Sequence, residues 1–83
     1  MEYEIETSHI NLDAELSDRQ LQVIEYFNRG FCYREVAEFM GISIRTVHDH
    51  ITRINKKLGT INRIDLLMYD VLKGRAQIEN YGG

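Results

Sequence analysis

The sequence contains no proline, no tryptophan and a single cysteine, Cys32, among its 83 residues. One cysteine excludes an internal disulfide and is typical of a reducing compartment. No apolar run is long enough to span a membrane, and the first residues lack the basic and then apolar pattern of a secretion signal. With an apolar fraction of 43%, the absence of proline favours a compact helical protein over a disordered one. We therefore expect one small cytoplasmic domain, which a partner chain would stabilise.

The residue types that bind metals or perform catalysis are also sparse. The three histidines and the cysteine are scattered, without the spacing of metal ligands. His48 and His50 are two positions apart, so on a helix their side chains diverge. Cys32 belongs to no motif that would pair it with a histidine, and no set of nucleophile, base and oxyanion donors is present. We expect no catalytic residue, no metal, no cofactor and no enzymatic activity.

An excess of basic charge is missing, because the formal net charge is −3. The acidity is concentrated in residues 1–15, which hold five acidic residues and no lysine or arginine. Residues 16–60 hold seven basic and five acidic residues, and within residues 43–58 four basic residues accompany only Asp49. Local charge governs contact with a polyanion more than net charge does. DNA therefore remains a candidate partner, although the acidic segment weakens long-range attraction.

Capping residues and apolar spacing predict two helices in the first half of the chain. The first begins at Ser17, with Gln20 as its capping-box partner, and ends at residues 28–30, where Gly30 can adopt the left-handed conformation. Its apolar residues are Leu21, Val23, Ile24 and Phe27. The second runs from about residue 33 to 40, with Val36, Ala37 and Met40 on one face.

A short turn containing Gly41 leads to a third predicted helix, which is typical of a helix-turn-helix. Ser43 caps this helix and Gly59 ends it, so residues 43–58 form the predicted recognition helix. Its inner stripe is Val47, Ile51, Ile54 and Leu58, at helical spacing. A polar stripe on another face consists of Arg45, Asp49, Thr52 and Lys56, with His48 beside it.

The fourth predicted helix starts near Asn62 and ends near Gly74, and it is apolar on more than one face. A helix on the surface of a single domain needs only one apolar stripe, so the excess predicts a dimer interface. The candidates for this interface are Leu67, Met68 and Val71. Ordinary core packing is the alternative role, for which Leu66 and Ile64 are the better candidates.

The two ends of the chain give weaker signals. Residues 1–15 form an acidic arm in which alternation at Tyr3, Ile5 and Thr7 suggests a strand or an ordered segment. The apolar residues Tyr3, Ile5 and Ile10 would either brace the domain or cover a partner's surface. Residues 75–83 are expected to form a frayed tail.

Taken together, these residues resemble the LuxR/GerE-type (NarL/FixJ-like) helix-turn-helix DNA-binding domain. The similarity covers residues 16–74 without gaps. It is carried by Leu16-Ser17-Asp18-Arg19-Gln20, Val23, Gly30, Glu35-Val36-Ala37, Ile42-Ser43, Arg45-Thr46-Val47, His50, Ile54, Lys57-Leu58-Gly59 and Asn62-Arg63. The resemblance implies an all-α four-helix domain of a bacterial or phage transcription regulator. Because only fifteen residues precede the domain, the chain resembles stand-alone members without a receiver or ligand-binding domain.

The resemblance also implies which residues contact DNA. His48, Asp49 and Thr52 match positions that contact base edges from the major groove. Histidine can donate to guanine, threonine can contact a thymine methyl group, and aspartate can accept from a cytosine amino group but is repelled by phosphates. The alternative is a solvated helix face on which Asp49 pairs with Arg45 or Arg53, four positions away.

Six residues are candidates for phosphate contacts: Arg34, Arg45, Thr46, Arg53, Lys56 and Lys57. Solubility is the alternative role for these side chains, above all for the two lysines. For His50, a packed and hydrogen-bonded place in the helix is favoured over a phosphate contact. The chain departs from the family's usual residues at Asp18, Gln20, Cys32, His48, Asp49 and Asp70. Cys32 weakens the cap of the second helix, and Asp49 is the departure that bears most on DNA affinity.

Two hypotheses follow. The first is a sequence-specific regulator that binds double-stranded DNA as a homodimer through its fourth helix, in the cytoplasm at the nucleoid. The second is an interaction module that pairs through the same helix with a longer LuxR-type regulator and inactivates it.

Overall fold

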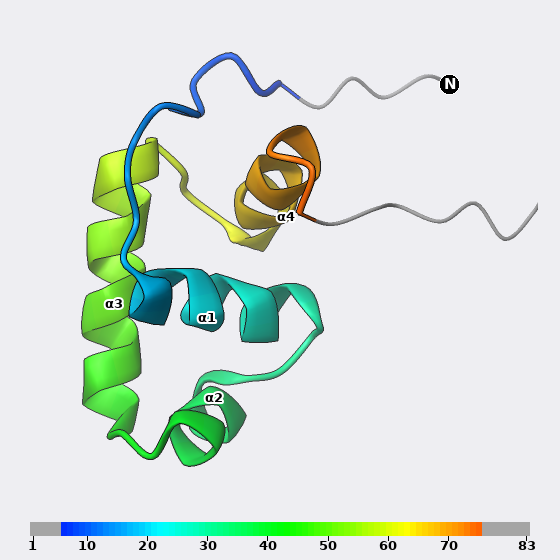
Figure 1. Cartoon of the computed structure of the whole chain (residues 1–83). Helices are drawn as coiled ribbons and strands as arrows, with labels where there is room; N and C mark the ends of the chain where they lie inside the picture. The colour runs from blue at the N-terminus through cyan, green and yellow to red at the C-terminus, as the bar shows by residue number, and fades with distance from the viewer. Residues whose placement is uncertain (1–5, 76–83) are drawn as a thin grey trace, which may run out of the picture.

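A computed structural model of the chain describes residues 6–75, which fold into four α-helices (Figure 1). The helices are α1 (Asp18–Asn28), α2 (Tyr33–Met40), α3 (Ile44–Leu58) and α4 (Arg63–Leu72). Residues 6–75 contain no strand, so the prediction of an all-α domain is confirmed. The signals at Tyr3 and Ile5, and the predicted tail beyond residue 75, lie outside the described residues. No helix within the described part of the chain is both long and apolar enough to cross a membrane.

The helix starts follow the predicted capping residues. Ser17 and Gln20 form a reciprocal capping box: the Ser17 hydroxyl accepts the Gln20 backbone N–H at 3.1 Å, and Gln20 Oε1 accepts the Ser17 N–H at 2.9 Å. Ser43 caps α3 by accepting from the backbone N–H of Thr46 at 3.0 Å. Asn62 caps α4 by accepting from the N–H of Asp65 at 2.9 Å. These side chains satisfy N–H groups that the first turn of a helix leaves free.

The core lies on one side of α3, where α1 and α2 pack directly against it and α4 packs against α1 (Figure 1). The predicted inner stripe of α3 is confirmed, because all four of its residues are buried. Opposite it lie the buried residues Val23, Ile24 and Phe27 of α1 and Val36, Ala37 and Met40 of α2. α1 packs against each of the other helices. This packing fixes the orientation of α3 and leaves its opposite face free of other helices.

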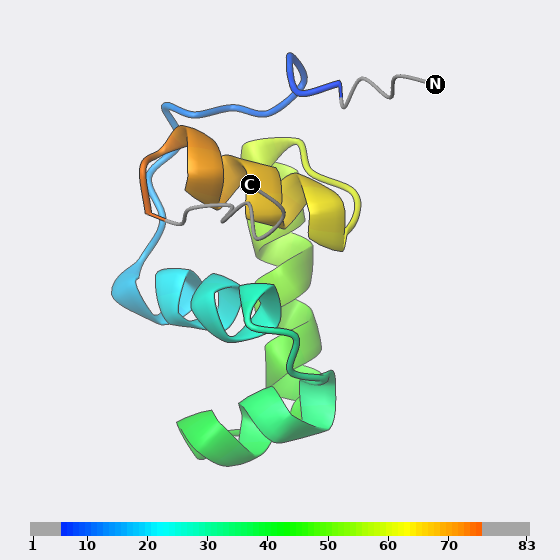
Figure 2. The same cartoon turned by 90° about the vertical axis from the view of Figure 1, so that its right-hand side faces the viewer.

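The arm ahead of α1 packs on the domain from residue 6 onward and passes over α4 (Figure 2). Ile10 is buried in the core, so it braces the domain. The backbone N–H of Asn11 donates to the carbonyl of Leu58, the last residue of α3, at 2.8 Å. His9 Nε2 lies 3.0 Å from Asp65 Oδ2, and Lys73 Nζ donates to the Leu12 carbonyl at 3.0 Å. The arm therefore joins the end of α3 to α4.

α4 presents Leu66 and Tyr69 to the core, together with two buried carboxylates, Asp65 and Asp70. Leu66 has the predicted core position. The expectation that Ile64 also serves the core is wrong, because Ile64 is 56% exposed. The cause is helical geometry: residues two positions apart lie about 200° apart around the helix axis, so Ile64 faces away from Leu66.

Candidate nucleic-acid interface

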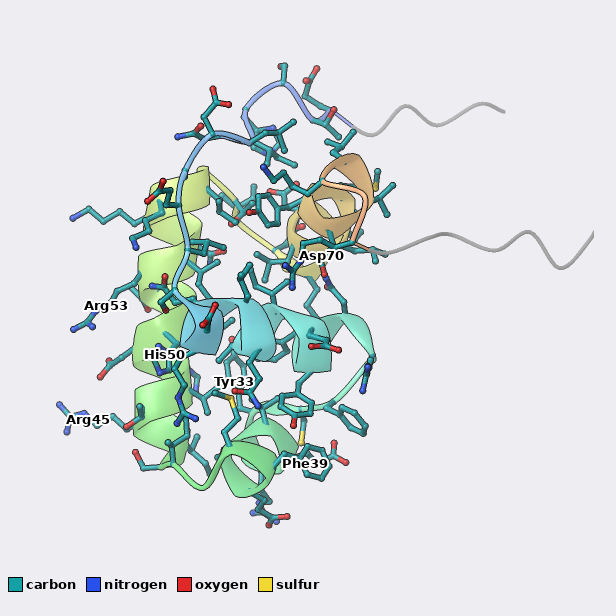
Figure 3. All side chains as sticks on the ribbon, in the orientation of Figure 1. Tyr33, Phe39, Arg45, His50, Arg53 and Asp70 are labelled. Carbon is teal, nitrogen blue, oxygen red and sulfur yellow. The ribbon has the colours of Figure 1, made fainter. Side chains whose placement is uncertain are left out.

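The outward face of α3 is polar and exposed. It consists of Arg45, His48, Asp49, Thr52, Arg53, Lys56 and Lys57, all of which are exposed. Arg45 and Arg53 project from α3 away from the other helices (Figure 3). The same helix therefore carries the core stripe on one side and a predominantly cationic surface on the other.

The remaining predicted contact residues lie at the edges of this surface. Thr46 is half-buried, and its hydroxyl lies 2.9 Å from that of Ser43. Arg34 is exposed in the first turn of α2, so it belongs to a different helix. His50 is half-buried on α3, as expected for a packed residue, but its side chain makes no hydrogen bond with residues 6–75. The expected hydrogen bond of His50 is therefore not present in this part of the chain.

A shallow groove at the junction of α1 and α3 is lined by Gln20, Arg53, Lys56 and Lys57. Lys57 Nζ donates to the Glu15 carbonyl and to Gln20 Oε1, each at 3.3 Å. Gln20 is only 6% exposed, and its Oε1 also accepts the backbone N–H of Ser17. One amide oxygen thus caps α1 and holds a lysine of α3. The sequence indicates Gln20 only as a capping residue, because the contact with Lys57 joins residues far apart in the chain.

Asp49 lies in the middle of the cationic surface, yet it forms no ion pair with any residue between 6 and 75. The alternative in which Asp49 pairs with Arg45 or Arg53 is therefore not observed. Its carboxylate is exposed on the face that would meet phosphates or base edges.

A contact that the sequence does not indicate joins α2 to this surface. The ring of Tyr33 stacks on the ring of His48, with 4.1 Å between centroids and 13° between planes. Tyr33 in turn packs edge-on against Phe27 of α1, at 4.9 Å and 77°. Tyr33 and His48 are fifteen positions apart in the chain and on different helices, so no helical spacing relates them.

Local hydrogen bonds hold both ends of α2, including the turn that leads into α3. At the start of α2 the Glu35 carboxylate accepts the backbone N–H of Cys32 at 3.0 Å, and this bond lowers the pKa of Glu35. At its end Gly41 has a φ of 67°, and the Ile42 N–H donates to the Ala37 carbonyl at 3.0 Å. A left-handed glycine of this kind closes a helix and redirects the chain.

Arg63 has a structural place rather than one on the cationic surface. Its guanidinium donates to the carbonyls of Phe27 at 3.1 Å and Phe31 at 2.7 Å, and lies 4.4 Å from the centre of the Phe27 ring. These contacts join the first turn of α4 to the end of α1. Within residues 6–75, no three His, Cys, Asp or Glu side chains are grouped so that they could hold a metal ion.

Comparison with known proteins agrees with this architecture. Residues 14–69 match the family described as bacterial regulatory proteins, luxR family. The chain therefore belongs to the luxR family of bacterial regulatory proteins, which confirms the resemblance seen in its residues.

Several proteins of known description are similar to the chain. The transcriptional regulatory protein TdiR of Thauera aromatica is 35% identical over 74 residues, which cover 89% of this chain and 32% of TdiR. The transcriptional activator protein PhzR of Pseudomonas fluorescens is 31% identical over 86% of this chain and 29% of PhzR. The oxygen regulatory protein NreC of Staphylococcus aureus is 34% identical over 70% of this chain and 27% of NreC. The chain thus spans about a third or less of the length of these relatives. No solved structure matches it significantly.

Proposed function

We propose that this chain binds double-stranded DNA by inserting α3 into the major groove, and that it regulates transcription from the sites it binds. The observation that carries the proposal is the uncovered outward face of α3, where Arg45, Arg53, Lys56 and Lys57 surround a polar centre. An α-helix fits the major groove, which is about 12 Å wide. Two relatives, the transcriptional regulatory protein TdiR and the transcriptional activator protein PhzR, support the same role.

In this arrangement the centre and the edges of the surface have different roles. His48, Asp49 and Thr52 face base edges, where hydrogen bonds and methyl contacts distinguish base pairs. Phosphate contacts come from Arg34, Arg45, Thr46, Arg53, Lys56 and Lys57, and they set the position and register of the helix. Binding of this kind takes place at the nucleoid, in the cytoplasm.

The proposal includes a homodimer formed through α4. Its outward face consists only of apolar residues: Ile64, Leu67, Met68, Val71 and Leu72. Three of these are half-buried, while Ile64 is 56% and Leu72 is 46% exposed. The other sides of α4 are occupied by α1, through Asn28, and by the arm, through His9 and Leu12. An apolar stripe on the one uncovered side of the helix supports pairing there through Leu67, Met68 and Val71.

Sedimentation of Ile64→Asp and Leu67→Asp tests the dimer. Ile64 is 56% exposed, so its substitution is not expected to unfold the domain, and half-buried Leu67 is one of the three predicted interface residues. We expect both variants to sediment as monomers where the unaltered chain is dimeric. Phe39→Asp is the matched control, because Phe39 is a 50% exposed apolar residue of α2 (Figure 3). A dimer that survives both α4 substitutions would exclude this interface.

Selection from random double-stranded DNA at low salt tests sequence-specific binding. We expect a two-fold site with half-sites about one helical turn apart. Arg53→Ala should lower the slope of log affinity against log salt by about one, as the loss of one phosphate contact requires. Arg29→Ala is the control, because Arg29 is an exposed arginine that pairs with Glu25 at the end of α1. No enriched sequence at low salt would contradict the proposal.

The interaction module is the second candidate, and it is favoured by Asp49, which has no ion pair within residues 6–75. A carboxylate on the DNA-facing helix weakens attraction to phosphates, while the apolar face of α4 suits pairing with the corresponding helix of a longer LuxR-type regulator. In this case the chain would co-purify with such a regulator and abolish its DNA binding. Asp49→Ala would leave that inhibition unchanged, whereas Leu67→Asp would remove it.

A further inference from the structure

Among the candidate base-contacting residues, His48 stacks on an aromatic side chain of another helix, Tyr33 of α2. Its ring lies nearly parallel to that of Tyr33, 13° apart, with 4.1 Å between centroids. Tyr33 is itself half-buried and held edge-on by Phe27, a core residue that is 4% exposed. Thr52 and Asp49 are exposed, with no hydrogen bond from their side chains to residues 6–75.

A stacked imidazole keeps its polar edge while losing rotational freedom. Both ring nitrogens lie in the plane of the ring, so covering one face with Tyr33 leaves the nitrogens available for hydrogen bonds. The stack restricts the side-chain torsions of His48 before any ligand arrives. A pre-organised side chain loses less entropy on binding than a free one, and it tolerates less variation in the position of its partner.

We propose that Tyr33 is a positioning residue that holds the His48 ring so that one N–H reads guanine in the major groove. The inference rests on the proposed DNA-binding function and names a residue outside α3 as a determinant of specificity. Guanine offers two neighbouring acceptors, N7 and O6, to a donor in the groove, whereas adenine places an amino donor beside its N7. An imidazole N–H held toward the O6 position meets an acceptor in guanine but an amino donor in adenine, whereas a mobile imidazole can turn to N7, which both purines share.

The test compares base preference in Tyr33→Leu and Tyr33→Phe. Each protein is used to select sites from random double-stranded DNA, and affinity is then measured for the selected site with each base at the position under His48. We expect the unaltered chain to prefer guanine by about fivefold or more, the lower range for a base-edge contact. Tyr33→Leu fills the space against Phe27 but lacks an aromatic ring, so the guanine preference should be lost while affinity for non-specific DNA is retained.

Tyr33→Phe is the matched control, because it keeps both ring contacts and removes only the hydroxyl. We expect it to retain the guanine preference, and loss of preference equal to that of Tyr33→Leu would overturn the inference. His48→Ala, at an exposed position, tests the pair independently of the packing around Tyr33. It should abolish the guanine preference, and combining it with Tyr33→Leu should cause no further loss, as a thermodynamic cycle requires for residues that act together.

Other outcomes separate this inference from the function on which it rests. If the unaltered chain selects a site and Tyr33→Leu keeps the same base preference, the role of Tyr33 is excluded while DNA recognition stands. If His48→Ala keeps the guanine preference, another residue reads that position and the inference fails. If the unaltered chain selects no sequence at all, the proposed function fails, and this inference fails with it.

Discussion

Two aspartates of α4 are buried in this small domain, whereas an aspartate of α3 is exposed. Asp65 and Asp70 of α4 are 5% and 4% exposed, and each is hydrogen-bonded by more than one partner. Asp49 of α3 is exposed and has no ion pair within residues 6–75. Burial of a carboxylate is costly unless hydrogen bonds compensate it, so the two aspartates of α4 are part of the fold. No ion pair within residues 6–75 ties Asp49 to the fold, so we expect its role to lie in recognition.

The largest effect on stability is expected from substitution of Asp65, which joins the arm, the turn before α4 and α4 itself. Its carboxylate accepts the backbone N–H of Ile61 at 2.9 Å, contacts His9 at 3.0 Å and lies in the first turn of α4, where negative charge is favourable. We expect Asp65→Ala to lower the free energy of unfolding by about 2–3 kcal/mol, measured by urea denaturation. His9→Ala is the control that removes only the contact with the arm. If Asp65→Ala and His9→Ala lose equal stability, the contact between Asp65 and His9 accounts for the whole effect.

A smaller effect on stability is expected from substitution of Asp70, which lies between α1 and α4 (Figure 3). Asp70 accepts from Asn28 Nδ2 at 2.7 Å and from Arg75 Nε at 3.2 Å. Asp70→Ala should cost about 1–2 kcal/mol in urea denaturation, because Asn28 still donates to the Leu66 carbonyl and Arg75 is partly exposed to solvent. Asp70→Asn keeps an acceptor for Asn28 and should recover part of the loss. Full stability of Asp70→Ala would contradict a structural role for the pair.

Acid should weaken the domain through Asp65. Burial raises the pKa of this carboxyl, but the hydrogen bonds from His9 and Ile61 and the charge of His9 outweigh it, so its pKa lies below the ordinary value of 3.8. A carboxyl with a lowered pKa in the folded state contributes stability above its unfolded pKa, and that contribution is lost as pH falls through the folded pKa. The stability difference between the unaltered chain and Asp65→Asn should therefore shrink below pH 3.8. Urea denaturation across this range measures it, and a constant difference would exclude the effect.

The smallest effect on stability is expected at Asp49. Asp49→Ala should change the free energy of unfolding by no more than about 0.5 kcal/mol, because Asp49 is exposed and has no ion pair within residues 6–75. Affinity for non-specific DNA should rise by about fivefold, the effect of removing about 1 kcal/mol of repulsion near a phosphate. Gel-shift titration at low salt measures it, with Glu38→Ala, which removes an exposed carboxylate of α2, as the control. Loss of a cytosine preference instead would show that Asp49 reads a base.

Local features of the sequence predict most of this fold. Ser17, Ser43 and Asn62 mark helix starts because each cap bonds to a group three positions away, a distance that the sequence displays directly. The inner stripe of α3 follows from spacings of three and four residues. The prediction for Ile64 failed because it ignored the position of Leu66. Once Leu66 is known to face the core, a residue two positions away must face outward.

The candidate site was predictable in part, for the same physical reason. Which residues lie on the outward face of α3 follows from helical spacing. The ring stack of Tyr33 on His48 and the hydrogen bond between Gln20 and Lys57 depend on how the helices pack. So does the absence of an ion pair at Asp49 within residues 6–75. Spacing along one helix carries no information about that packing. The contacts of Asp70 with Asn28 join different helices in the same way, so a polar residue at an inner position of α4 was visible in the sequence but its partner was not.

The arm has a consequence for the order in which the domain assembles. Its partners are the Leu58 carbonyl at the end of α3 and Asp65 and Lys73 in and after α4, up to 61 positions away along the chain. These partners take up their positions only when α3 and α4 have formed, and closing so long a loop carries a larger entropic cost than forming a helix turn. We therefore expect arm docking to be the last step of folding and the first to reverse. Amide hydrogen exchange at Asn11 should accordingly be faster than exchange in the middle of α3, as in a segment that opens while the helices stay closed.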